Sequence, residues 1–142
     1  MRALFDVNVV IDVLAHRAPF YDDSYAALRL VAEGRLEGYI AAGSVADMAY
    51  ILHRGGLEAA DIRSRLVSLT QILDVRDTTA ADVANALGAT VPDMEDAILA
   101  AGAKRAGADV IVTRDAQGFT ASPVPALSPA QVLSRITEAG DA

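Results

Sequence analysis

Short hydrophobic runs of β type alternate along this chain with longer stretches in which apolar residues recur at helical spacing. The short runs predict strands at residues 2–5, 38–42, 71–75, 109–113 and 123–127. The longer stretches predict helices at residues 8–15, 21–33, 44–54, 58–69, 79–87, 93–103 and 128–138. This alternation predicts an α/β fold with a central parallel sheet flanked by helices.

Glycine and proline mark the boundaries of these elements. Gly34 follows the second predicted helix as a stop signal, and the prolines of the last predicted strand favour an edge position in the sheet. No repeat, low-complexity tract or linker interrupts the 142 residues. The sequence therefore predicts a single domain over residues 1–142.

Composition narrows the classes of protein. Hydrophobic residues make up 53% of the chain, which excludes a disordered chain. Cysteine is absent, so disulfides, thiolate metal sites and cysteine nucleophiles are excluded. The only histidines are His16 and His53, which we expect at the surface or at helix ends rather than on zinc. No apolar run reaches the roughly 20 residues of a membrane span, so we expect a cytoplasmic protein without a membrane partner.

The charge balance argues against a broad basic surface. Twelve Lys and Arg face nineteen Asp and Glu, giving a net charge of −7. A polyanion would bind such a chain only with local help from a few placed arginines, a divalent cation or a basic partner protein.

Four aspartates fall at the points where strands of the predicted sheet end. Asp6 follows the first strand directly, and Asp115 lies two residues beyond the strand at 109–113. Asp47 and Asp96 each stand in the first turn of a predicted helix. Ligands of parallel α/β sheets collect beyond the carboxyl ends of the strands, so we expect these side chains to share one edge.

Each of these acids also has a local explanation. The two helix-start acids stand three residues after Ser44 and Asp93, as in a capping box, while Asp6 and Asp115 suit turns. Capping does not explain why four acids from distant segments share one edge. Converging carboxylates repel one another unless a cation compensates, and Mg²⁺ or Mn²⁺ prefers oxygen ligands. The set predicts a metal site for phosphoryl transfer.

Other acids have weaker claims. We expect Asp12 to be an exposed helix carboxylate, Asp82 to be solvated or in a turn, and Glu95 to point away from the cluster. Asp93 is a candidate N-cap that could also hold a water or a second ion.

Four segments, at residues 4–12, 44–52, 93–103 and 107–119, resemble in order and spacing the PIN-domain ribonucleases, among them the VapC-type toxins of bacterial toxin–antitoxin pairs. The ending at residues 122–129 is also similar to the bacterial branch, so the resemblance runs from the first strand to the last helix. It implies an α/β/α sandwich with an endoribonuclease site, dependent on Mg²⁺ or Mn²⁺, at the strand ends.

The resemblance carries residue roles with it. Asp6, Asp96 and Asp115 match metal-binding catalytic acids, and Asp47 stands where the family usually has Glu, so its metal contact would pass through water. Many relatives have Asn in place of Asp115 and an acid just before the following Phe, where this chain has Gly118.

The resemblance further implies supporting residues and partners. Asn8 and Thr113 match polar positions that hold the first and last carboxylates in place. The expected partners are an RNA substrate, a cognate antitoxin with basic or aromatic side chains, and a second copy of the chain in a homodimer. Candidates for RNA contacts are Arg17, Arg54, Arg114, Lys104 and Arg105.

Rival interpretations differ in kind. Asp47 and Gly118 leave open a catalytically silent PIN-fold module that only binds proteins. A dehalogenase-type phosphatase would need an acid where Asn8 stands, and a response-regulator receiver would need a lysine near the end, whereas the only lysine is Lys104.

Overall fold

A computed structural model describes residues 1–141 and contains a five-stranded parallel sheet. Its strands lie in the order β3-β2-β1-β4-β5, so the first strand of the chain is central. The last strand lies at an edge, as predicted. The strands are β1 (Arg2–Phe5), β2 (Glu37–Ala41), β3 (Asp74–Arg76), β4 (Val110–Val112) and β5 (Ala126–Leu127).

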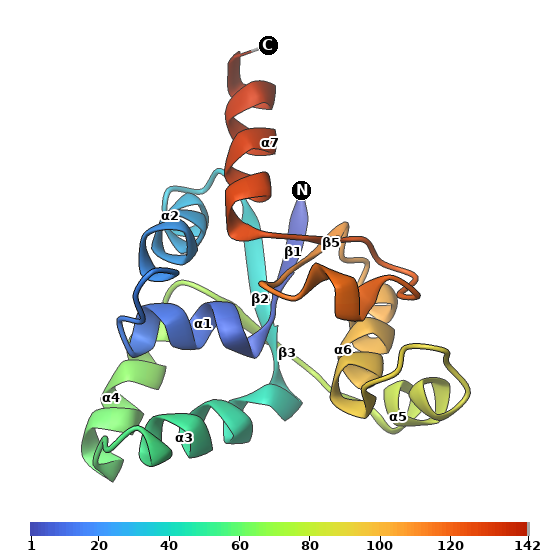
Figure 1. The fold of residues 1–142 in the computed structure, drawn as a ribbon, viewed down its shortest axis with the longest axis horizontal. Coiled ribbons are helices and arrows are strands. Elements are labelled where there is room, and N and C mark those ends of the chain that lie inside the picture. Colours follow the sequence, from blue (N-terminus) through green and yellow to red (C-terminus); the bar gives the residue numbers. More distant parts are fainter. Residues whose placement is uncertain (142) are drawn as a thin grey trace.

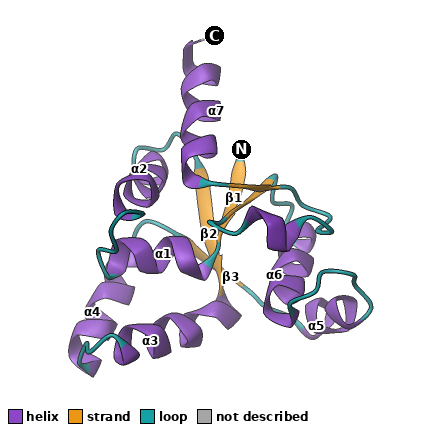
Figure 2. Cartoon of the chain, in the orientation of Figure 1, coloured by secondary structure: helices purple, strands orange, loops and turns teal. Residues whose placement is uncertain are grey.

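Helices cover both faces of the sheet, which confirms the predicted α/β architecture (Figures 1 and 2). One side carries α1 (Val7–Leu14), α2 (Tyr21–Ala32), α3 (Val45–Arg54) and α4 (Ala59–Thr70), with α7 (Pro129–Asp141) packed on α2. The other side carries α5 (Ala80–Leu87) and α6 (Met94–Arg105). Two 3-10 turns, η1 (Ala42–Ser44) and η2 (Ala116–Phe119), follow β2 and β4. No helix among the described residues is long and apolar enough to cross a membrane.

The core has two layers because successive side chains of a strand point to opposite faces of the sheet. Phe5 of β1 and Ile40 of β2 pack into the larger layer, beneath α1 to α4 and α7. Leu4 and Tyr39, their neighbours in sequence, pack into the smaller layer beneath α6. The central strand is buried on both faces, which fixes its carboxyl end and therefore the position of Asp6.

The predicted elements are all present, but β3 and β5 each begin three residues later than predicted, at Asp74 and Ala126. Gly34 ends α2 with a φ of +73°, a left-handed conformation that favours glycine. The helix predicted from residue 44 begins instead at Val45, after the η1 turn, and Ser44 makes no side-chain capping bond. The capping box expected at Ser44 is therefore wrong, because this residue already lies in a helical conformation and its hydroxyl does not meet the free amides.

Candidate active site

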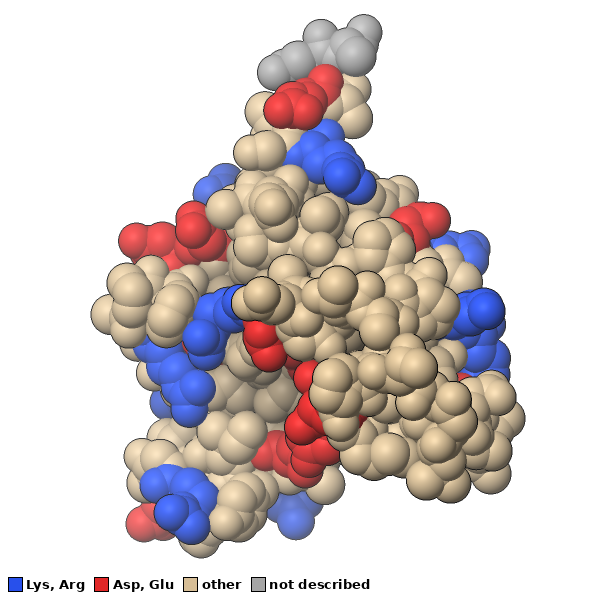
Figure 3. Space-filling model, turned by 45° about the vertical axis from the view of Figure 1, so that its right-hand side comes forward, with Lys and Arg blue, Asp and Glu red and all other residues tan. Residues whose placement is uncertain are grey.

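The four sequence-predicted aspartates lie around the carboxyl edge of the sheet. Asp6 follows β1, Asp47 lies in the first turn of α3 and Asp96 in the first turn of α6, and all three line one cavity of about 290 Å³. Asp115 follows β4 and lies beside Asp96. Both carboxylates border the space next to Gly118, since a methyl group added there would lie 2.7 Å from Asp115 Oδ2 and 3.3 Å from Asp96 Oδ2. Figure 3 shows acidic side chains gathered in a hollow of this face, with basic side chains along one side of it.

A hydrogen-bond network centred on Thr113 holds two of these acids. The hydroxyl of Thr113 donates to Asp6 Oδ2 at 2.8 Å and accepts from the Asp115 amide at 3.0 Å and from Asn8 Nδ2 at 3.4 Å. One donated and two accepted bonds use the full capacity of a hydroxyl. Asn8 also accepts from the Arg114 amide through Oδ1 at 3.3 Å. Thr113 and Asn8 therefore link α1 to the loop after β4. From there they contact Asp6 and the backbone next to Asp115, the two acids that they are expected to hold in place.

Capping accounts for only part of the acidic set. Asp6 Oδ1 accepts from the Val7 amide at 2.8 Å, Asp93 Oδ1 from the Asp96 amide at 3.0 Å, and Asp115 Oδ1 from the Gly118 amide at 3.3 Å. These bonds use one oxygen of each carboxylate. The carboxylates of Asp47 and Asp96 make no hydrogen bond or ion pair with any residue that the structure describes, so both are free to bind a ligand.

Burial and neighbouring negative charges raise the pKa values of Asp6 and Asp96. Burial, followed by the negative charges of Asp6, Asp93, Asp115 and Glu95, raises the pKa of Asp96 from its ordinary 3.8 to about 6. Burial also raises the pKa of Asp6, although the bonds from Thr113 and Val7 oppose this shift. No cationic side chain among residues 1–141 pairs with these acids, so a net negative charge collects at the edge.

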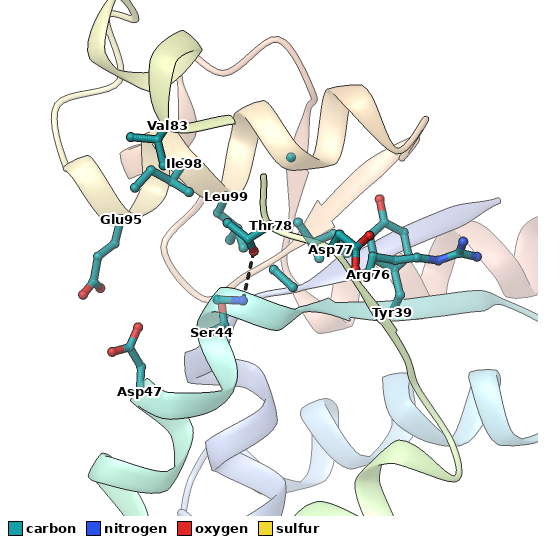
Figure 4. A pocket seen from close by; sticks show the side chains of 14 residues that line it. Tyr39, Ser44, Asp47, Arg76, Asp77, Thr78, Val83, Glu95, Ile98 and Leu99 are labelled. Carbon is teal, nitrogen blue, oxygen red and sulfur yellow. Dashed lines mark hydrogen bonds between the residues drawn. The ribbon is translucent and has the colours of Figure 1, made fainter. Parts of the chain in front are cut away.

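Glu95 is the residue that the sequence interpretation missed. The structure contradicts the expectation that it points away, since Glu95 lines the same cavity as Asp47, and their carboxylates face each other in Figure 4. The charge of Asp47 is the main cause that raises the pKa of Glu95, followed by burial. A sequence signal existed: Glu95, Ile98 and Leu99 have the i, i+3, i+4 spacing of one helix face.

Two further acids expected at the surface are buried. Asp12 is 0% exposed and accepts from Arg114 Nε at 2.7 Å and from the Ser24 hydroxyl at 3.2 Å. Asp82 is likewise 0% exposed, completes a capping box with Thr79 and pairs with Arg105 Nε at 2.8 Å. Both expectations are wrong because each carboxylate has a guanidinium partner from a distant segment, which compensates the loss of water.

These pairs also engage two of the basic residues. Arg105 is held by Asp82, and the Arg114 guanidinium is held by Asp12 and lies 3.9 Å from the centre of the Phe20 ring. Both arginines are engaged in ion pairs in this structure, and a role in guiding RNA stays a prediction for them. Exposed Arg17, Arg54 and Lys104 stay candidates, and Arg54 donates to the hydroxyl of Tyr50, which lines the acidic cavity, at 3.3 Å.

The chemistry of the donor set fits a hard divalent cation. The cavity and its rim offer carboxylate oxygens and no sulfur or imidazole. No three such side chains among residues 1–141 stand close enough to enclose an ion unaided. Magnesium usually keeps several waters and takes one or two carboxylates directly, so an open cluster of this kind suits it better than a closed cage.

Comparison with known proteins shows the family of this chain. A family model described as PIN domain matches residues 2–117, a stretch that includes all four aspartates. The chain belongs to the PIN domain family. A search of curated proteins gives no match.

Solved structures share the fold of this PIN domain at low sequence identity. VapBC2 from Rickettsia felis, bound to a DNA fragment from its promoter, is 17% identical, with a TM-score of 0.71 over 90% of this chain and 98% of that one. FitAcB from Neisseria gonorrhoeae is 23% identical, with a TM-score of 0.68 over 90% and 98%. A toxin–antitoxin complex from Klebsiella pneumoniae is 16% identical, with a TM-score of 0.67 over 89% and 97%.

Proposed function

We propose that this PIN domain is an endoribonuclease dependent on Mg²⁺ or Mn²⁺ and the toxin of a toxin–antitoxin pair. The observation that carries the proposal is the set of carboxylates from separate segments that meet at one edge without a cationic partner among the described residues. This arrangement raises the pKa of Asp96 to about 6, which is unfavourable for the isolated protein at neutral pH. A bound divalent cation removes that penalty.

Asp6, Asp96 and Asp115 are the proposed metal-binding acids, one or two of them in direct contact with the ion and the others, like Asp47, acting through bound water. When bound, the cation supplies Lewis acidity that activates water and offsets charge developing on a phosphodiester. Thr113 and the Val7 amide keep Asp6 in one orientation, and the Gly118 amide does the same for Asp115. Glu95 adds negative charge at the mouth of the cavity opposite Asp47, as Figure 4 shows. No side-chain nucleophile is needed.

The toxin assignment rests on the structural relatives. The Klebsiella structure is a toxin–antitoxin complex by name, and VapBC2 shares its name with the VapC-type toxins that the sequence resembles. Each has the fold over about nine-tenths of this chain. An acidic nuclease suits such a pair, because a basic antitoxin segment would be drawn to the acidic hollow and would block it. A homodimer and a cytoplasmic location are part of the same proposal.

Incubation of the purified protein with a mixture of cellular RNAs tests the nuclease activity. We expect new RNA ends with Mg²⁺ or Mn²⁺, none in EDTA, and a loss of at least 100-fold in rate for Asp96→Asn. Asp61→Asn is the matched control, because Asp61 is exposed on α4 and does not line the cavity. Wild-type activity in Asp96→Asn, or undiminished cleavage in EDTA, would contradict the proposal. No cleavage under any condition would favour the silent protein-binding module.

A further inference from the structure

A second cavity, of about 250 Å³, opens beside the acidic one, and the proposed chemistry does not use it. Ser44, Asp47, Glu95 and Leu99 line both cavities, so the two lie side by side. Figure 4 shows Asp47 and Glu95 at one end of this second cavity and Tyr39 with Arg76 at the other. We call it the side pocket.

The walls of the side pocket suit a flat, weakly polar group. Leu4, Val83, Ile98 and Leu99 supply apolar surface from β1, α5 and α6. The Arg76 guanidinium lies 5.7 Å from the centre of the Tyr39 ring and covers it at the far end. The volume is below the roughly 300–1,000 Å³ of pockets for drug-sized ligands, which favours one ring system over a peptide segment.

The polar groups of the side pocket are mainly free acceptors. The carboxylates of Asp47, Asp77 and Glu95 line it and make no hydrogen bond or ion pair with any residue that the structure describes. The hydroxyl of Thr78, by contrast, is engaged, since it accepts from the Gly43 amide at 2.9 Å, the dashed line in Figure 4. A ligand that donates hydrogen bonds from its edge would satisfy these acceptors.

We infer that the side pocket holds one nucleobase of the RNA next to the cleaved phosphodiester and selects bases that carry an exocyclic amino group. Single-stranded RNA is commonly read by splaying a base into a pocket of apolar contacts and edge hydrogen bonds. Adenine, cytosine and guanine carry an exocyclic amino group that donates to the free carboxylates. Uracil has only its ring N3–H, flanked by two carbonyl oxygens that the carboxylates repel, so we expect uracil to bind more weakly. The inference rests on the proposed nuclease function.

Nuclear magnetic resonance of methyl groups tests the inference without RNA cleavage. The protein is titrated in EDTA with adenosine, cytidine or uridine at millimolar concentration. These nucleosides are neutral, so no phosphate group is repelled by the acidic hollow. We expect saturable shifts of the Ile98 and Leu99 methyl signals with adenosine and cytidine, and binding at least threefold weaker with uridine. Val83→Trp fills the pocket and should abolish the shifts. Leu87→Trp, one turn away on the same helix, 73% exposed and outside the pocket, should keep them.

Each outcome decides the inference. Absence of shifts with all three nucleosides, equal shifts with uridine, or shifts unchanged in Val83→Trp would overturn it. A response to a basic antitoxin peptide alone would assign the pocket to a protein partner instead. If Val83→Trp fails to fold, the wild-type titrations with the three nucleosides still show whether the side pocket binds a base and discriminates against uracil. Nucleoside binding without cleavage of RNA would contradict the nuclease proposal but leave the side pocket as a nucleobase site. Cleavage of RNA without nucleoside binding would contradict the nucleobase site but leave the nuclease proposal standing.

Discussion

The carboxylate of Asp115 occupies the space that a side chain at position 118 would need. A methyl group on Gly118 would stand 2.7 Å from Asp115 Oδ2, closer than side chains approach one another, and 3.3 Å from Asp96 Oδ2. Without a side chain at position 118, the Asp115 carboxylate has room to lie beside Asp96.

Gly118→Ala should therefore weaken metal binding without removing any ligand. The added methyl group would push the Asp115 carboxylate aside, and we expect roughly a tenfold loss of Mn²⁺ affinity, or about 1.4 kcal/mol. Calorimetric titration measures it. In an Asp115→Asn background the same substitution should change little, because the two residues act as one unit. Equal losses in both backgrounds would contradict a direct effect on Asp115.

Asp96→Asn should stabilise the metal-free fold at neutral pH. The pKa of Asp96 is raised in the folded state, so its penalty is full above about pH 6, shrinks as the pH falls and vanishes below about 4. For this half-buried group we expect about 1 kcal/mol after solvent screening, or a Tm higher by roughly 2–4 °C at pH 7.5. Thermal melts in EDTA from pH 4 to 8 test this sign. A variant less stable than wild type at pH 7.5 would argue against crowded carboxylates.

Burial, and not bond length, should decide which ion pairs matter for stability. Arg114–Asp12 and Arg29–Glu33 both have an N···O distance of 2.7 Å, but the Asp12 side chain is 0% exposed and that of Glu33 is 38% exposed. Arg114→Met leaves a buried charge unpaired and should lower the free energy of unfolding by about 3 kcal/mol. Arg29→Met should change it by less than about 0.5 kcal/mol. Urea denaturation measures both, and similar losses would refute the distinction.

Arg54→Ala should weaken RNA binding through one lost phosphate contact. Arg54 lies on α3 next to Tyr50 at the edge of the acidic cavity. We expect the slope of log affinity against log salt to fall by about 0.7, as for one phosphate of a single strand. Fluorescence anisotropy in EDTA measures it, with Arg135→Ala on α7 as the control. An unchanged slope in Arg54→Ala would place the RNA elsewhere.

The sequence predicts the order of elements and the place of Asp6 and Asp115, because both follow buried strands whose hydrophobic runs are unmistakable. Asp47 and Asp96 follow from the same rule, since helices of a parallel sheet begin where strands end. The helix end marked by Gly34 and the edge strand with its prolines are equally local signals.

Burial of single carboxylates could not be predicted in this way. Asp12 is buried because Arg114, 102 positions away, reaches it, and no local pattern contains that partner. Asp82 depends in the same way on Arg105 of another helix. Glu95 could not be placed for a different reason. The spacing to Leu99 predicts the helix face on which Glu95 lies, but only the packing of the helices turns this face toward Asp47 of α3.

Calorimetric titration of the purified, metal-stripped protein with Mn²⁺ at pH 7.5 shows whether the carboxylates at the sheet edge bind a divalent cation. We expect saturable binding to the wild type and to Asp61→Asn, and at least a tenfold weaker affinity in both Asp6→Asn and Asp96→Asn. Binding that is absent from the folded wild type, or equally strong in all four proteins, would contradict the proposed metal site.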